Sequence, residues 1–173
     1  MRIPLAKLPW QEVEIDFITN LPLKSSNRVD DGSNNPTEIT NTTSGGCVMV
    51  CCDKLTKMIH LVGFKHLPTA RETARAYLRN VFKLHGFPLG ITTDRGTQFT
   101  NQLWKKLMEF FNVEIHLATT DHHETVGQIE RNNAYVETYL RCFVKQFEDE
   151  EWMDYLYLAC SCYDATSTIY YII

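Results

Sequence analysis

No stretch of this sequence approaches the ~20 consecutive apolar residues that a membrane-spanning helix needs. Its first residues lack the charged and then apolar layout of a secretory signal peptide. The chain also has no glycine-rich phosphate-binding loop, no dinucleotide fingerprint and no Gly-x-Ser-x-Gly nucleophile elbow. These absences give no support to a membrane protein, an NTPase, an oxidoreductase or a serine hydrolase. We therefore expect no membrane partner and no nucleotide cofactor.

The cysteines do not have the spacing of a zinc site. There are six of them, but none forms a C-x2-C pair or has a histidine at ligand spacing. Cys47, Cys51 and Cys52 lie in residues 47–52, an apolar run that is typical of a buried strand. Disulfides are improbable in a chain synthesised in the cytosol. We interpret these thiols as small core residues.

Basic residues are fewer than acidic ones, 17 against 21, and the net charge is −4. This balance is unusual for a DNA-binding protein, because phosphates are normally contacted by Lys and Arg. Four basic residues recur at every fourth position, which places them on one face of a helix: Arg71, Arg75, Arg79 and Lys83. We interpret that face as solvated. The acidic run at residues 148–151 is predicted to begin a helix rather than to bind metal.

What the sequence does contain is typical of one folded domain. A chain of 173 residues can bury a sizeable core. Its 44% hydrophobic content, with nine Phe, eight Tyr and three Trp, favours a globular fold over a disordered tail.

Three acidic residues occupy positions from which their side chains could converge. Asp16 lies in an alternating, strand-like segment, Asp94 ends a second apolar segment, and Glu130 lies near the start of a helical pattern. Hard divalent cations prefer such oxygen ligands, and a pair of them can clamp the attacking and leaving oxygens of a phosphoryl displacement. The spacing alone is weak support, because 21 acidic residues give many pairs at any separation.

The segments around these residues add specificity, since six motifs occur in one order. They are residues 9–18 (PWQEVEIDFI) with Leu21 and Pro22, 53–60 (DKLTKMIH), 85–88 (HGFP), 93–100 (TDRGTQFT), 122–130 (HHETVGQIE), and the helix residues Arg131, Asn133, Glu137, Tyr139, Leu140 and Arg141. They resemble the PWxxxxxDFIxxLP, DRLTKMAH, HGxP, SDRGxQFTS and HPQTDGQTE segments, and the helix after them, of integrases from gypsy-type LTR retrotransposons, in the retroviral-type integrase superfamily. The resemblance covers about residues 9–163.

The resemblance implies an α/β, ribonuclease H-like fold: a five-stranded mixed sheet flanked by helices. It implies that Asp16, Asp94 and Glu130 are the catalytic residues and metal ligands, holding two Mg²⁺ (or Mn²⁺) ions. For DNA binding it indicates six further residues: Gln98, His122, Gln128, Arg131, Asn133 and Arg141.

The implied reactions are water-mediated trimming of the 3′ ends of element DNA, and then attack of the new 3′-hydroxyl on target DNA. The implied partners are therefore element ends and target DNA, together with further copies of the chain in a homodimer or higher oligomer. The implied site of action is the nucleus, after synthesis in the cytoplasm.

We expect a lead-in at residues 1–8, a catalytic core at 9–165 and an apolar end at 166–173. Within the core, residues 24–46 are rich in Ser, Asn, Thr, Asp and Gly and read as a loop insertion relative to the family. The zinc-binding N-terminal domain that such integrases usually carry is not expected in this chain. The core could for that reason be inactive in isolation.

Hydrophobic periodicity predicts the elements of the core. Strands are expected at residues 11–19, 47–52, 58–64, 89–94 and 113–118, the first three as an antiparallel meander. A helix is expected from about Ala70 to a stop at Gly86, with Thr69 and Glu72 as a capping box. A second is expected at about 101–111, with its whole apolar stripe in the core. After a polar loop at 119–127, further helices are expected at about 128–147 and 152–163.

Two other functions stay open. Departures from the family segment at His123, Glu124 and Val126 are compatible with a decayed or domesticated relic, kept as a DNA-binding or interaction module. The second alternative is another ribonuclease H-like nuclease, such as a cut-and-paste transposase. The DRGTQFT and DKLTK segments count against that alternative.

Overall fold

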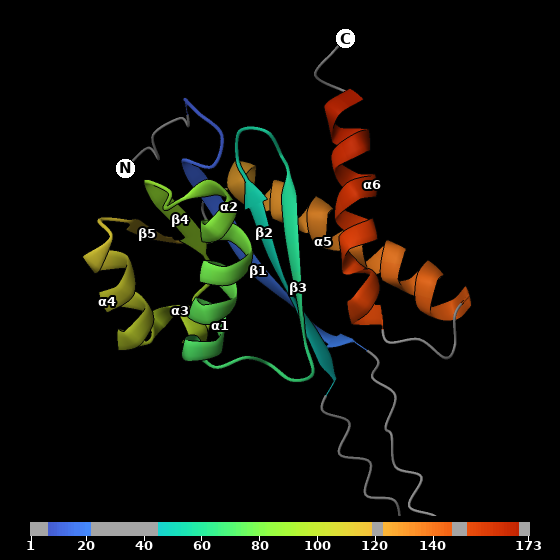
Figure 1. Cartoon of the computed structure of the whole chain (residues 1–173), viewed down its shortest axis with the longest axis horizontal. Coiled ribbons are helices and arrows are strands. Elements are labelled where there is room, and N and C mark those ends of the chain that lie inside the picture. Colours follow the sequence, from blue (N-terminus) through green and yellow to red (C-terminus); the bar gives the residue numbers. More distant parts are fainter. Residues whose placement is uncertain (1–6, 22–44, 119–122, 147–151, 170–173) are drawn as a thin grey trace, which may run out of the picture.

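The computed structural model describes residues 7–21, 45–118, 123–146 and 152–169 (Figure 1). Within these ranges it describes the backbone alone at 123–130, 143–146 and 165–169. Nearly all of the predicted insertion at 24–46, and the acidic run at 148–151, therefore lie outside the described residues.

A five-stranded mixed sheet forms the centre of the fold, in the order β3-β2-β1-β4-β5. The strands are β1 (Glu12–Leu21), β2 (Gly46–Asp53), β3 (Ile59–Phe64), β4 (Gly90–Thr93) and β5 (Glu114–Leu117). Strands β1, β2 and β3 pair antiparallel, whereas β4 pairs parallel with both β1 and β5. Both the predicted sheet and the predicted meander are confirmed.

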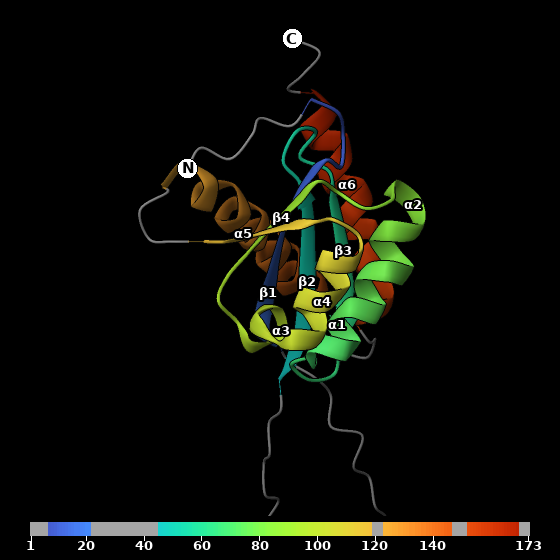
Figure 2. The ribbon, with the colours of Figure 1, turned by 90° about the vertical axis from the view of Figure 1, so that its left-hand side faces the viewer.

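Helices cover both faces of the sheet (Figures 1 and 2). One layer contains α1 (Ala70–Tyr77), the π-helical η1 (Leu78–Phe82), α2 (Lys83–His85), α3 (Thr97–Thr100) and α4 (Gln102–Phe110). The other contains α5 (His123–Gln146), the 3₁₀-helical η2 (Trp152–Tyr155) and α6 (Leu156–Ile169).

The alternation of β1 divides the core into two parts, because successive side chains of a strand point to opposite faces. Val13 and Ile15 pack into the layer with α1 and α4, whereas Ile18 packs with Val136 and Leu140 of α5. Every residue of β2 is buried, which confirms its thiols as core residues.

The helix after β3 begins as predicted. The Thr69 hydroxyl accepts a hydrogen bond from the Glu72 backbone N–H, and the Glu72 carboxylate accepts one from the Thr69 N–H at 2.8 Å. Gly86, with φ of 80°, ends the helical segment in a conformation that favours glycine. The basic face of this segment is exposed, as predicted.

The prediction that the whole apolar stripe of α4 is core is wrong. Trp104 and Met108 are buried, but Leu103 is 47% exposed and Phe110 is 78% exposed. A short helix on a sheet buries one face, and Leu103 and Phe110 lie seven positions apart on a neighbouring face. The helix therefore has two apolar faces, one of which is left open.

The predicted loop at 119–127 is also partly wrong, because α5 begins at His123. Gly127 does not prevent this, since one glycine inside a helix costs only about 1 kcal/mol. Residues 119–122 lie outside the described part. At the other end of the chain, α6 continues to Ile169 and includes part of the expected apolar end. Among the described helices, none combines the length and the apolar character that crossing a membrane requires.

Candidate metal centre

Asp94 directly follows the end of β4, and Asp16 lies beside that end in the middle of the longer, adjacent strand β1. β1 and β4 run parallel, with Ile15 paired to Thr93, and each aspartate follows its member of that pair by one residue. Neighbouring strands are about 4.8 Å apart, so the two carboxylates are neighbours. The sheet thus brings together two acidic residues that lie far apart in the sequence.

The third element of the site is α5, which packs against β1 at Asp16. The side-chain Nδ2 of Asn133 donates a hydrogen bond to Oδ2 of Asp16 at 2.8 Å. Glu130, the third predicted ligand, lies in α5 three positions, or nearly one helical turn, before Asn133. The side chain of Glu130 lies outside the described part of the structure.

The two aspartates have different surroundings. Burial raises the pKa of Asp16, and the nearby charge of Asp94 raises it further, whereas hydrogen bonds from the Phe17 backbone and Asn133 lower it. Asp94 is exposed, and its Oδ1 accepts a hydrogen bond from the Gly96 N–H at 2.9 Å. A divalent cation would offset both the burial and the mutual repulsion.

Gly96 explains why the DRG turn needs a residue without a side chain. A Cβ at this position would lie 2.9 Å from Oδ1 of Asp94 and 2.7 Å from Oε1 of Gln98. A larger residue here would force the Gln98 amide and the Asp94 carboxylate to shift.

The donor set suits a hard cation. Aspartate oxygens are the ligands that Mg²⁺ and Mn²⁺ prefer. The carbonyl oxygen of Asn133 is buried without a hydrogen-bond partner among the described residues, so an ordered water would suit it. No group of three His, Cys, Asp or Glu side chains that could hold a metal forms within the described residues. Two of the three predicted ligands, Asp16 and Asp94, are described with their side chains, and the two fit the ion.

The predicted DNA-binding residues are in different situations. Gln98 is 6% exposed, so it would have to turn outward to touch DNA, whereas Arg131 and Arg141 are exposed on α5. Gln128 lies in the part of α5 where only the backbone is described, and His122 lies outside the described residues. Their contacts with DNA stay predictions.

Sequence reasoning missed a polar stripe that continues from Asp16 along β1. Glu12 and Glu14 are 4% and 5% exposed. Burial raises the pKa of Glu14 to about 7, against the lowering effect of the nearby Lys54, whose Nζ donates to Oγ1 of Thr92 at 2.6 Å. The signal was available, because carboxylates at alternate positions of a strand share one face.

A second cluster unites three of the sequence motifs near the start of β1. The ring of Trp10 stacks on His85 with 3.9 Å between ring centroids, and the backbone N–H of Trp10 donates to Oδ1 of Asp53 at 3.0 Å. Nε2 of His60 lies 2.7 Å from Nε2 of His85. Burial, and then the neighbouring His85, lower the pKa of His60 to about 4. This cluster packs the chain at a distance from Asp16, so these motif residues are part of the fold rather than of the metal centre.

The chain has relatives among transposon polyproteins. It is 32% identical over 162 residues to the Transposon Tf2-3 and Tf2-4 polyproteins of Schizosaccharomyces pombe, and the match covers 94% of the chain. The chain spans 11% of the length of these curated relatives. No protein-family profile matches it.

Solved structures share the fold. The HTLV-2 integrase catalytic core domain in complex with magnesium, in its trimeric form, has a TM-score of 0.67 and 18% identity, covering 90% of this chain and 86% of that one. The simian T-cell lymphotropic virus intasome in complex with PP2A regulatory subunit B56 gamma has a TM-score of 0.70 and 16% identity, covering 92% of this chain and 50% of that one. These similarities show that the fold is ribonuclease H-like.

Proposed function

We propose that the chain is an integrase catalytic core of the LTR-retrotransposon type and that it performs metal-dependent polynucleotidyl transfer; its transposon relatives and its fold support this. The reactions would be trimming of the 3′ ends of element DNA and transfer of those ends into target DNA. The observation that carries the proposal is the meeting of Asp16, Asp94 and α5 beside the end of β4.

Each element of the centre has a separate task in this proposal. Asp94 is exposed beside the tight turn at Gly96, so it faces the solution from which a DNA backbone would approach. Asp16 is more buried, and the Asn133 amide fixes one of its oxygens. The remaining oxygens of the two aspartates, together with Glu130, would hold the metal.

A bound pair of Mg²⁺ or Mn²⁺ ions would supply the Lewis-acid chemistry that activates the attacking oxygen and stabilises the leaving one. The protein contributes position. Because Asp16 is held by the sheet and by Asn133, little reorganisation would be needed when the ions and DNA bind.

The proposed partners are element ends, target DNA and further copies of the chain. The HTLV-2 core was solved in dimeric and trimeric forms, which supports an oligomer in this proposal. Strand transfer into chromosomal DNA would place the working protein in the nucleus. Arg131 and Arg141, exposed on α5, would contact phosphates.

The test is a disintegration assay, in which the chain rejoins a branched oligonucleotide in Mg²⁺ or Mn²⁺. We expect metal-dependent product from the wild type and at least a hundredfold less from Asp94→Asn. Asp154→Asn, an exposed aspartate of η2 distant in the sequence from the centre, is the matched control and should retain activity. A folded wild type that makes no product in either metal would contradict the proposal and favour the relic.

A further inference from the structure

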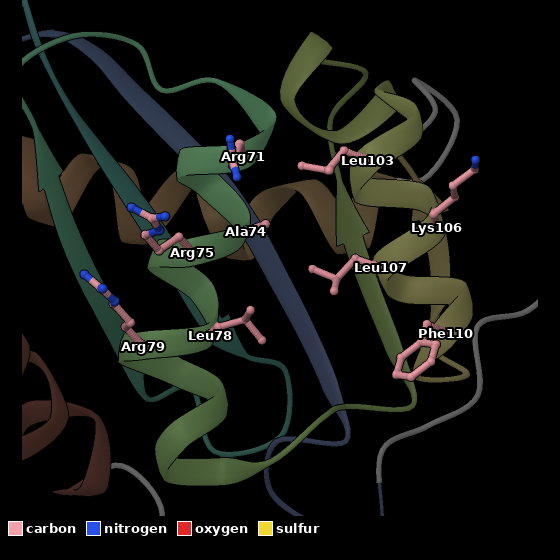
Figure 3. Close-up of a pocket in the computed structure, with 9 residues that line it drawn as sticks. All are labelled: Arg71, Ala74, Arg75, Leu78, Arg79, Leu103, Lys106, Leu107 and Phe110. Carbon is pink, nitrogen blue, oxygen red and sulfur yellow. The ribbon is translucent and has the colours of Figure 1, made fainter.

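An open groove runs between α1 and α4, on the layer of helices that does not contain α5 (Figure 3). It has a volume of about 570 Å³. Leu78, Leu103 and Leu107 point into the gap between the two helices, and Phe110 lies at one end of it. The floor of the groove is therefore aliphatic.

The fold itself does not account for this apolar surface. α4 already anchors to the core through Trp104 and Met108, both fully buried. Leu103 and Phe110, on its second apolar face, remain 47% and 78% exposed. Adjacent apolar side chains that stay in water along a groove are typical of an interaction site.

The margins of the groove are basic. Arg71, Arg75 and Arg79 line it from α1 and η1, and Lys106 lines it from α4. In Figure 3, Arg75 of α1 and Arg79 of η1 lie on the side of their helical segment away from α4, and Lys106 lies on the outer side of α4. None of these four residues forms an ion pair in the described part of the chain, and the nearby Glu72 carboxylate is engaged by the cap of α1.

We propose that this groove binds an amphipathic, acidic helix from another protein. The apolar stripe of the helix would fill the space over Leu103, Leu107 and Phe110. Its flanking carboxylates would reach the two basic margins. The three arginines repeat every four residues, a rise of about 6 Å along α1, and carboxylates four residues apart on a partner helix have the same repeat.

The aliphatic floor favours a helix over a nucleic acid. Phosphates would satisfy the arginines, but they would leave Leu103 and Leu107 in contact with water. Nucleic-acid grooves of this kind usually offer aromatic platforms for the bases, and Phe110 is the one aromatic residue that lines this groove in the described part of the chain. The occupant that matches both the floor and the margins is an apolar stripe with acidic flanks.

The test is selection of a random 16-residue peptide display library on the immobilised chain, followed by fluorescence anisotropy with the enriched peptides. We expect enriched peptides to carry apolar residues at helical spacing with Asp or Glu beside them. Leu103→Glu should weaken their binding at least tenfold, and Arg75→Glu about threefold to tenfold. Replacing the peptide's acids by Lys should restore binding to Arg75→Glu.

Two exposed residues outside the groove provide matched controls. Leu89→Glu repeats the apolar-to-acid change, and Lys105→Glu repeats the charge reversal on α4 itself. Both should bind within twofold of the wild type. The proposal is overturned if no peptide is enriched above the bare support, if the enriched peptides lack acids, or if the groove variants bind unchanged. It is also overturned if a 20-base-pair duplex binds the chain and loses that binding in Arg75→Glu but not in Leu103→Glu.

Discussion

The side-chain amide of Asn133 donates a hydrogen bond to the carboxylate of Asp16 across 117 positions of sequence, with 2.8 Å between Nδ2 and Oδ2. The bond joins α5 to β1, the two elements that carry Glu130 and Asp16. It gives Asn133 a positioning role for the metal centre, in addition to the contact with DNA that the sequence predicts.

Replacing Asn133 by Ala should reduce disintegration activity about 10-fold to 100-fold, a range typical of lost partners of metal ligands. The reduction should be larger in Mg²⁺ than in Mn²⁺, because Mg²⁺ demands more regular ligand geometry. Asn80→Ala is the matched control, since that amide donates only to the Ala76 carbonyl within its own helical segment. Equal losses in the two variants would contradict a role at the centre.

Glu14 should destabilise the fold at neutral pH. Its pKa is raised to about 7 mainly by burial, so the folded state holds a proton that the unfolded state releases above pH 4.5. The free energy of unfolding therefore falls by on the order of 2–3 kcal/mol as the pH rises from 4.5 to 7. Glu14→Gln should therefore raise the free energy of unfolding at pH 8 by about 1–3 kcal/mol, and change it little at pH 4.5. Urea unfolding at the two pH values measures this, and equal effects at both would argue against it.

His60 should act in the opposite direction over much of the same pH range. Burial and the neighbouring His85 lower the pKa of His60 from 6.5 to about 4, so the unfolded chain takes up a proton before the folded one does. Stability is lost as pH falls from 6.5 to 4. In the wild type this slope partly offsets that of Glu14. The melting temperature of His60→Gln should consequently rise more than that of the wild type when the pH is lowered from 7 to 5. A variant that melts with the wild-type pH dependence would contradict the lowered pKa of His60.

The two apolar faces of α4 should differ in their contribution to stability. Trp104→Ala removes a fully buried ring and should lower the free energy of unfolding by about 3–5 kcal/mol. Leu103→Ala, one position earlier on the open face, should lower it by less than about 1 kcal/mol. Denaturant midpoints of the two variants provide the comparison. Similar losses would mean that the groove face is part of the core.

Much of the fold could be predicted from the sequence, because local patterns determine it. The five strands follow from the hydrophobic periodicity and the mixed sheet from the matched motifs, and the Thr69 capping box is visible in four residues. The division of α4 into a buried and an open face could not be predicted. Trp104 and Leu103 are adjacent apolar residues of the same predicted stripe. Only the position of the sheet decides which of the two side chains is buried.

For the metal centre, the sequence likewise predicts the ligands but not the residues that hold them in position. Asp16 and Asp94 follow from the motifs, whereas the Asn133 amide finds Asp16 only through the packing of α5 on β1. The raised pKa of Glu14 depends on its burial beside Lys54, which is a tertiary property. The same holds for the stacking of Trp10 on His85.

We propose above all that Asp16, Asp94 and Glu130 form one divalent-metal site. Titration of Mn²⁺ into the chain, with free Mn²⁺ counted by electron paramagnetic resonance, tests it without requiring DNA. We expect saturable binding to the wild type that weakens at least tenfold in Asp16→Asn, in Asp94→Asn and in Glu130→Gln, with Asp154→Asn unchanged. A wild type that binds no Mn²⁺, or a Glu130→Gln variant that binds it as tightly as the wild type, would contradict the claim.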